Sequence, residues 1–327
     1  MVNQRRKIVI IGAGTIGTAL GNIIAETGRS EVILHSIESN VVDTINNTGI
    51  NQKYFPTIRL DQSLKATTNN EVLSSADIIF LAIPSIILID YLSGIKNHLN
   101  HEAILVNLAK GFGNGHKTII QCLKEQFPNP VCTMKGPSFA KEIINRIPTG
   151  FTLGTGNEMI RASVSDIFLD TPIFLDHSTD VTGVELLSIL KNIYAIVMGI
   201  VDAHFDSANI RFLILTKSFN EMKNILLTYK GNEETLFKYC GYGDFTLTAL
   251  NDLSRNRTLG LLIGKGFFTE HVSHELVLEG QIAVNVFYEE ISKTRDITHE
   301  FPIITELYKI LKSKYDISGF VNTVLRF

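Results

Sequence analysis

One lysine lies alone in the most apolar stretch of this chain. Residues 183–201 read GVELLSILKNIYAIVMGIV, and Lys191 is the only charged residue between Glu185 and Asp202. Burying a lone ammonium is costly unless a partner compensates its charge, so a lysine kept in such a place has a specific role. Two roles fit: one half of a structural ion pair, or a proton donor in catalysis. The stretch alone leaves both open.

A glycine pattern near the N-terminus predicts that a dinucleotide binds. The apolar residues 7–11 run into GAGTIG at residues 12–17, which a helical pattern and a second apolar segment follow. In this context the first glycine permits a tight turn, the second lets the backbone approach a pyrophosphate, and the third lets helix and strand pack closely. Amides at the start of the helix favour the anion. We expect the cofactor, NADH or NADPH, to contact Gly12, Gly14, Thr15, Ile16 and Gly17.

The choice between NADH and NADPH is normally made near the end of the second strand, where Asp or Glu holds the ribose of NAD and Arg accommodates the extra phosphate of NADP. This place reads His35-Ser36-Ile37-Glu38 here. It has no arginine, and Glu38 lies slightly late, so a solvated loop charge fits it at least as well as a ribose contact. The sequence leaves the preference open.

Three turns that follow predicted strands carry groups able to bind a ligand: residues 84–85, 110–111 and 135–138. Ligands of open α/β sheets bind beyond the carboxyl ends of strands. Proline and glycine in these turns also fit ordinary turn chemistry. We expect a functional role for Lys110, which lies beside a glycine at a strand end. For Lys135 and Lys141 a structural role is the better interpretation.

Two stretches of the second half are unusually polar. Residues 241–244 (GYGD) form a glycine-rich turn that ends in Asp244, and residues 254–257 (SRNR) stand at the start of a predicted helix. One interpretation of SRNR is a helix cap followed by surface arginines. The sharper one is a phosphate site, because arginine makes bidentate contacts to phosphate and a helix N-terminus adds its dipole.

The elements that must position these residues fall into two groups, which predict an N-terminal Rossmann-type doubly wound α/β domain (1–180) and a mainly α-helical domain (181–327). Apolar strand patterns alternate with helical ones in the first, and helical patterns dominate the second. The predicted strands are 7–11, 31–35, 78–83, 103–108, 131–134, 150–153 and 173–175. The predicted helices of the second domain are 183–201, opened by Gly183, then 209–229, 233–238, 252–263, 275–294 and 303–314.

Composition excludes several other classes of protein. The 327 residues are 45% hydrophobic and 19% charged, with a net charge of −3, which favours neither nucleic acid nor a membrane as partner. A membrane span over 183–201 would carry Lys191 at its centre, at a cost of about 2.5–3.5 kcal/mol, between acidic flanks. The three cysteines match no metal-ligand spacing, so we expect no metal site and a reducing, cytoplasmic location.

Taken together, the motifs closely resemble those of one family, the bacterial-type NAD(P)-dependent glycerol-3-phosphate dehydrogenases. The resemblance extends over nearly the whole chain and keeps the same order. The motifs are GAGTIGTAL from Gly12, IPS at Ile83, AKGF at Ala109, GPSFAKE at Gly136, GVEL with LKNIYAI ending at Ile196, SANIR at Ser207, LTKSFNEM at Leu215, GYGDFTLT at Gly241, SRNR at Ser254, LEG at Leu278 and FPI at Phe301.

The resemblance implies roles for single residues. Lys191 corresponds to the family's catalytic lysine, and Lys110 and Asp244 are implied to take part in catalysis with it. Residues that line the substrate are Lys110, Gly136, Ser138, Lys191, Asp244, Ser254, Arg255 and Asn256. Residues near the cofactor, besides those of the glycine turn, are Lys110, Ala140, Arg255, Val277 and Glu279.

The chain departs from the family's pattern at a few positions. Leu187 and Ser188 stand where the family usually has two small residues, and Leu187 puts close helix packing in doubt. Ser218 is the small residue after Thr216-Lys217, and Ile37 stands where the family has a basic residue, which puts NADPH preference in doubt.

The implied activity is the reversible reduction of dihydroxyacetone phosphate to sn-glycerol 3-phosphate, which would feed glycerophospholipid synthesis. Two other hypotheses remain: a related reductase of 2-keto or 3-hydroxy acids that binds a carboxylate at Arg255, and a decayed enzyme that binds the nucleotide without turnover. The sequence is compatible with a homodimer. It determines neither the oligomeric state nor any feedback regulation.

Overall fold

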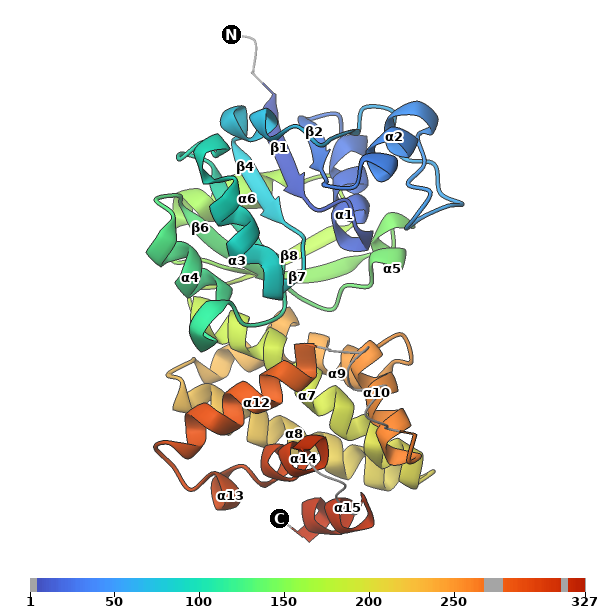
Figure 1. Cartoon of the computed structure of the whole chain (residues 1–327), viewed down its shortest axis with the longest axis vertical. Coiled ribbons are helices and arrows are strands. Elements are labelled where there is room, and N and C mark those ends of the chain that lie inside the picture. The colour runs from blue at the N-terminus through green and yellow to red at the C-terminus, as the bar shows by residue number, and fades with distance from the viewer. Residues whose placement is uncertain (1–4, 268–278, 313–316, 327) are drawn as a thin grey trace. The chain divides into compact units, whose positions relative to one another are not determined.

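The computed structural model of the chain describes residues 5–267, 279–312 and 317–326, with the side chain of Ser318 excepted. The chain divides into two compact units, Met1–Glu185 and Leu186–Phe327, and each is described by itself (Figure 1). We expected the boundary after residue 180; the division lies after Glu185, inside a long helix.

The first unit is built on one eight-stranded sheet. The strand order is β3-β2-β1-β4-β5-β6-β7-β8, and neighbouring strands are parallel except for the antiparallel pair β6 and β7. The strands are β1 (Arg6–Ile11), β2 (Ser30–His35), β3 (Lys65–Thr67), β4 (Ile78–Leu81), β5 (Ile104–Asn107), β6 (Val131–Lys135), β7 (Thr149–Gly154) and β8 (Ile173–Ser178). A mainly parallel sheet with helical crossovers confirms the predicted Rossmann-type fold.

Helices connect these strands and cover the sheet. They are α1 (Thr15–Glu26), α2 (Ser39–Thr48), α3 (Ser85–Gly94), α4 (Ile119–Gln126), α5 (Ala140–Ile144) and α6 (Glu158–Ile167), with three 3₁₀ turns, η1 (Asn70–Ser75), η2 (Lys96–His98) and η3 (Asn114–His116). The sheet is covered on both faces, as the sequence predicts (Figure 1).

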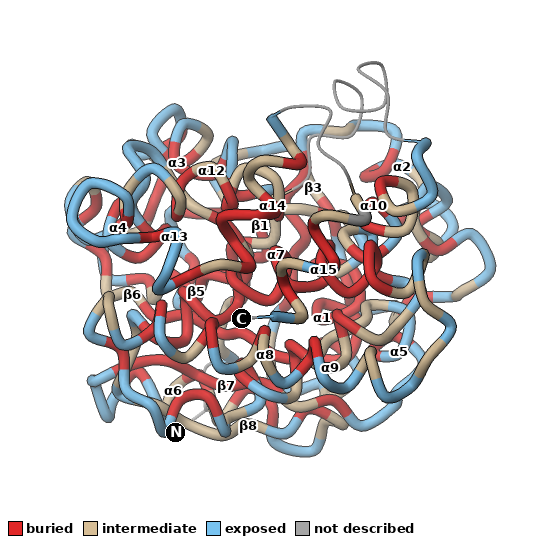
Figure 2. Tube along the Cα trace, turned by 90° about the horizontal axis from the view of Figure 1, so that it is seen from below, coloured by how far each residue is buried: buried red, intermediate tan, exposed pale blue. Residues whose placement is uncertain are grey.

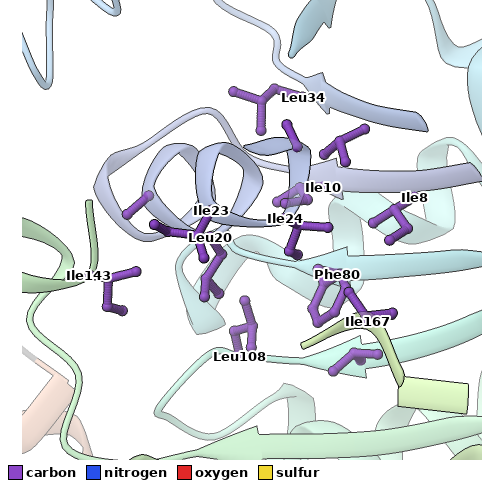
Figure 3. Close-up of a cluster of buried hydrophobic side chains, with 14 of the residues drawn as sticks. Ile8, Ile10, Leu20, Ile23, Ile24, Leu34, Phe80, Leu108, Ile143 and Ile167 are labelled. Carbon is purple, nitrogen blue, oxygen red and sulfur yellow. The ribbon is translucent and has the colours of Figure 1, made fainter. Parts of the chain in front are cut away.

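Successive residues of the central strands point to opposite faces of the sheet. Ile8 and Ile10 of β1 join the apolar cluster that contains side chains of α1, α2, α5 and α6. Val9 and Ile11 join the cluster that contains side chains of α3 and α4. Figure 3 shows part of the first cluster, with side chains of α1, β1 and β4 lying together. Burial on both faces explains why these strands read as continuous apolar runs.

The sequence analysis missed one strand. β3 has three residues, Lys65, Ala66 and Thr67, and it pairs with β2 at the edge of the sheet. A strand of this length is too short to show a period-two pattern, and two of its three residues are polar. Its pairing depends on the neighbouring strand.

The described part of the second unit is helical, in agreement with the predicted class. Its helices are α7 (Val181–His204), which contains the boundary between the units, α8 (Ala208–Thr228), α9 (Asp244–Leu250), α10 (Arg255–Gly264), α12 (Glu279–Ser292), α13 (Ile297–Glu300), α14 (Pro302–Lys312) and α15 (Ile317–Arg326). The shorter turns are the 3₁₀ turn η4 (Glu233–Phe237) and the π-helical turn η5 (Tyr239–Gly243).

Helix α7 is the apolar stretch from which the sequence analysis began. It is long and apolar enough to cross a membrane, but its most apolar window is 100% buried, as in the core helix of a folded domain. Its trace is coloured as buried along this part in Figure 2. The helix begins at Val181, so the expectation that Gly183 opens it is wrong: the Asp180 side chain accepts a hydrogen bond from the Gly183 amide and caps the first turn.

Close packing of α7 and α10 occurs at glycines, away from Leu187. An ideal Cβ at Gly260 would lie 2.0 Å from the Ile196 carbonyl oxygen, and one at Gly199 would lie 2.2 Å from that of Arg257. Such distances require glycine at both positions. Leu187 and Ser188 are both fully buried, so the larger residue at 187 is accommodated in the core.

A buried carboxylate joins three helices of the second unit. Glu221 of α8 accepts hydrogen bonds from the amides of Ile303 and Ile304, at 2.8 and 2.9 Å, in the first turn of α14. It also accepts one from the hydroxyl of Tyr194 on α7, at 3.1 Å. Burial raises the pKa of Glu221 to about 7, although these three hydrogen bonds act in the opposite direction.

Candidate active site

The glycine turn between β1 and α1 has the backbone geometry that the fingerprint predicts. Gly12 has φ +112°, a conformation that favours glycine, and a Cβ there would lie 2.6 Å from the Ala82 carbonyl oxygen. At Gly17 a Cβ would lie 1.9 Å from the Gly12 carbonyl oxygen. The first and third glycines are therefore required by the fold itself, whether or not a ligand is present.

The second glycine faces open space. A Cβ at Gly14 would meet no atom of the described residues within 4 Å, and Gly14 is the N-cap of α1. No described side chain caps this helix end, next to which Thr15 is exposed and Ile16 half-buried. The amides of the first turn and the helix dipole can therefore bind an anion, so these residues fit the pyrophosphate of a dinucleotide.

The segment after β2 differs from a freely solvated loop. The carboxylate of Glu38 forms an ion pair with Lys53 and accepts a hydrogen bond from the Tyr54 hydroxyl at 3.1 Å. The Lys53 hydrogen bond lowers the pKa of Glu38, and Ile37 is 76% exposed. The place that would meet the adenosine ribose thus combines an acidic and a basic group, which is compatible with NADH or NADPH.

The turns after β5 and β6 bring three predicted substrate residues together. The Lys110 ammonium donates a hydrogen bond to the Gly136 carbonyl oxygen at 2.9 Å and lies 3.5 Å from the Ser138 hydroxyl oxygen. Ser138 in turn donates to Gly136, also at 2.9 Å. Ala140 begins α5 two residues later. Lys110 is half-buried, so its ammonium is held in a defined position at the carboxyl edge of the sheet.

The second unit places Lys191 in a buried polar cluster. Its ammonium donates to the Asp244 carboxylate at 2.5 Å and to the Thr248 hydroxyl at 3.0 Å. The side chains of Lys191 and Asp244 are 6% and 1% exposed. Asp244 follows the π-helical turn η5 and is the first residue of α9, which puts Thr248 one helical turn further on the same face. The sequence analysis missed Thr248; its signal was the four-residue spacing from Asp244.

The SRNR motif forms the start of α10. Ser254 is the N-cap, and its hydroxyl oxygen accepts a hydrogen bond from the Arg257 amide at 3.3 Å. Arg255 is exposed and stands in the first turn of the helix. Arg257 is buried and pairs with Asp202 and Asp252, which corrects the interpretation of both arginines as surface residues. Arg255 is thus the arginine of this motif that can meet a ligand.

The start of α12 packs beside the SRNR motif and beside the helix that carries Lys191. A Cβ at Gly280 would lie 2.6 Å from the Asn256 Oδ1 atom and 2.9 Å from the carbonyl oxygen of Asn192, the residue after Lys191. Glu279, which we predict near the cofactor, therefore precedes a residue in contact with Asn256 and with the Lys191 helix. The predicted cofactor residue Val277 lies outside the described residues.

Known proteins share this arrangement of sequence and fold. A family model of the N-terminus of the NAD-dependent glycerol-3-phosphate dehydrogenases matches residues 7–161, and the model of their C-terminus matches residues 180–322. A glycerol-3-phosphate dehydrogenase (NAD(P)+) of Methanothermobacter thermautotrophicus is 33% identical over 320 residues, which cover 96% of both chains. One of Clostridium botulinum is 33% identical over 325 residues and covers 98% of this chain and 97% of its own.

The likeness extends to three dimensions. The crystal structure of glycerol-3-phosphate dehydrogenase from Coxiella burnetii superimposes with a TM-score of 0.89 at 27% identity, over 99% of each chain. Both units therefore have their counterparts in one known enzyme. With its two domains in the same order and more than nine-tenths of its length aligned to relatives at about one-third identity, the chain belongs to the NAD-dependent glycerol-3-phosphate dehydrogenase family.

Proposed function

We propose that this chain reduces dihydroxyacetone phosphate to sn-glycerol 3-phosphate, reversibly, with NADH or NADPH as its cofactor. The observation that carries the proposal is the Lys191 cluster, in which an ammonium 6% exposed is held by Asp244 and Thr248. A positioned ammonium can stabilise the charge that develops on a ketone oxygen during reduction and can donate the proton. The product would feed glycerophospholipid synthesis, as the family resemblance implies.

In the proposed mechanism Lys191 acts on the carbonyl oxygen. When bound, the nicotinamide supplies a hydride to the ketone carbon. Negative charge then develops on the oxygen, where the Lys191 ammonium stabilises it and delivers a proton, so that the ketone becomes a secondary alcohol. In the reverse direction the neutral amine accepts that proton. The Asp244 carboxylate holds the Lys191 ammonium in an ion pair in the absence of substrate, and the Thr248 hydroxyl fixes the direction of its Nζ atom.

The remaining residues of the proposal bind and orient. Arg255 offers a planar guanidinium to the substrate phosphate, with Asn256 beside it and the α10 dipole behind it. The Ser254 hydroxyl accepts from the Arg257 amide, so its proton is available to a phosphate oxygen. Lys110 and Ser138 supply donors for the carbonyl and hydroxyl groups of the triose.

The test is an absorbance assay of NADH and NADPH oxidation, run separately, with dihydroxyacetone phosphate as substrate. We expect oxidation of at least one nucleotide and formation of sn-glycerol 3-phosphate. A non-phosphorylated 2-keto acid tests the alternative reductase, because it offers Arg255 a carboxylate in place of the phosphate. Turnover of the keto acid with none of the triose phosphate would refute the proposed function.

A further inference from the structure

Two strand-end turns of the first unit are joined by a second lysine, which the mechanism above does not use. Lys135 is the last residue of β6, and its side chain is 0% exposed. Its ammonium donates hydrogen bonds to the carbonyl oxygens of Asn107, at 3.1 Å, and of Ala109. These carbonyls belong to the residues that lead from β5 into Lys110, so Lys135 holds the backbone on which Lys110 is carried.

The contact between the two turns is reciprocal. Lys110 extends from the β5 turn and donates to the carbonyl oxygen of Gly136, the residue directly after Lys135, at 2.9 Å. Each lysine therefore binds backbone oxygens of the turn that carries the other. We call this arrangement of Lys110, Lys135 and their acceptor carbonyls the lysine clasp. Backbone movement in either turn would displace the Lys110 ammonium.

The charge of Lys135 has its own buried partner. The carboxylate of Glu185, near the start of α7, is 1% exposed and lies 3.1 Å from the Lys135 Nζ atom. Glu185 accepts a further hydrogen bond from the Asn107 amide group at 2.9 Å, another from the Thr133 hydroxyl, and a long one from the Ile120 amide at 3.4 Å. Glu185 thus binds the side chain of Asn107, and Lys135 binds the carbonyl oxygen of the same residue.

Stability alone does not account for this pair. Replacing a buried ion pair with apolar residues of similar volume is often neutral or stabilising, so a fold needs no buried ammonium at this position. What an apolar side chain cannot do is donate to the two carbonyls before Lys110. Positioning matters at a reacting centre, because a misplacement of about 1 Å can reduce the rate about 100-fold.

We propose that Lys135 is a positioning residue for the reaction: it fixes the turn that carries Lys110, and Glu185 orients Lys135 through their buried ion pair. The inference rests on the proposed function insofar as Lys110 orients the substrate. Lys135 and Glu185 are both buried, so they act through the turn and do not touch the substrate.

A double-mutant cycle tests whether Lys135 acts through Lys110. We expect Lys135→Met to reduce kcat/KM for dihydroxyacetone phosphate about 10- to 100-fold. If the effect passes through Lys110, the double variant Lys110→Met/Lys135→Met has the same kcat/KM as Lys110→Met alone. Independent effects, which multiply in the double variant, would overturn the proposal.

A second pair of variants separates positioning from a structural role. Lys135→Met leaves Glu185 without its buried partner and is expected to lower the urea midpoint of unfolding. The double variant Lys135→Met/Glu185→Leu also removes the carboxylate of that ion pair, so its midpoint should return toward the parent value while kcat/KM stays low. Recovery of kcat/KM together with the midpoint would show that Lys135 has only a structural role.

The matched control is Cys132→Ala, which lies on the same strand and is fully buried in the apolar cluster. This change should lower the unfolding midpoint, through lost packing, and leave kcat/KM at the parent value. A comparable loss of kcat/KM in Cys132→Ala would show that any weakening of β6 affects activity, against a specific role for Lys135.

One readout does not depend on turnover. The rate at which a water-soluble succinimidyl ester labels Lys110, measured by peptide mass spectrometry, reports how firmly its ammonium is held. We expect this rate to rise several-fold in Lys135→Met and to stay at the parent value in Cys132→Ala. An unchanged rate in Lys135→Met overturns the inference. A parent protein that fails to reduce the triose phosphate overturns the proposed function, and the labelling rates still decide whether Lys135 fixes Lys110.

Discussion

The surroundings of the Lys191 ammonium fit both roles that the sequence presents as alternatives. It is one half of a buried ion pair with Asp244, and it also has a geometry suited to a proton donor, with the Thr248 hydroxyl as a further partner. A catalytic lysine in a buried site needs a compensating carboxylate to remain charged between turnovers. The ion pair is therefore compatible with the catalytic role that we propose for this residue.

Lys191→Met should lower both turnover and stability. Loss of the proton donor is expected to reduce kcat about 10²- to 10⁴-fold, and loss of the ion pair with Asp244 to reduce the free energy of unfolding by about 3–5 kcal/mol. Lys191→Met/Asp244→Asn should regain much of the stability and none of the turnover. Urea unfolding and the absorbance assay measure the two effects. A Lys191→Met protein with the parent turnover would rule out the mechanism.

Thr248→Val should lower turnover. Valine has nearly the same shape but cannot accept the hydrogen bond from Lys191, so we expect kcat to fall several-fold, in line with a hydrogen bond of about 1 kcal/mol. Thr248→Ser keeps the hydroxyl and serves as the control, with a kcat near the parent value. Equal kcat values for the valine variant and the parent would remove Thr248 from the site.

Arg255→Ala should weaken substrate binding. A charge-assisted contact to phosphate of about 1.5–3 kcal/mol would be lost, which raises KM for the triose phosphate about 10- to 100-fold with unfolding unchanged, because Arg255 is exposed. Arg257→Ala provides the contrast: its guanidinium is buried against Asp202, so stability should fall. An unchanged KM in Arg255→Ala would place the phosphate elsewhere.

At the scale of elements, different glycines of the turn before α1 serve ligand binding and folding. Gly14 faces open space, whereas Gly12 and Gly17 are packed against the backbone. A side chain at Gly14 therefore occupies ligand space without disturbing the fold, and its φ of −74° is open to any residue.

Gly14→Val should abolish nucleotide binding in a protein that unfolds at the parent urea midpoint. The valine side chain would fill the space that the pyrophosphate needs next to the α1 amides. Fluorescence titration with NADH and NADPH measures the affinity, and Gly17→Ala, whose Cβ would clash with Gly12, is the contrasting variant that should lose stability. Retained affinity in Gly14→Val would mean that the cofactor lies elsewhere.

For the whole molecule, Glu221 should make unfolding depend on pH. The pKa of Glu221 is about 7 in the folded chain against an ordinary value of 4.5, so between these values the folded state keeps a proton that the unfolded state releases. The free energy of unfolding therefore falls as pH rises through this window, by about 3 kcal/mol in total.

Glu221→Gln removes this titration and should flatten that part of the pH dependence. Urea unfolding at pH 5 and pH 8 gives the loss of stability for the parent and for the variant, and the difference between the two losses isolates Glu221 because other titrating groups are common to both. The parent and the variant also differ in stability at a given pH, since glutamine cannot accept hydrogen bonds from both α14 amides. Equal losses in the two proteins would contradict the raised pKa.

The sequence by itself determined the fold class, and it marked most of the residues for which we propose chemical roles. Strand and helix patterns are local, because the alternating faces of a strand and the apolar face of a helix are formed by residues close together in the sequence. The glycine turn is equally local, since backbone sterics at Gly12 act within a few residues. The motif order that identifies the family is a property of the sequence as well.

Only the tertiary structure decided which side chains meet. Asp244 and Thr248 bind an ammonium more than 50 residues away, Lys135 reaches the turn of Lys110, and Arg257 is buried against Asp202. A short edge strand such as β3 exists because β2 offers it a partner. Such pairings depend on packing between distant segments, and that packing is determined by the sum of many weak apolar contacts rather than by any local pattern.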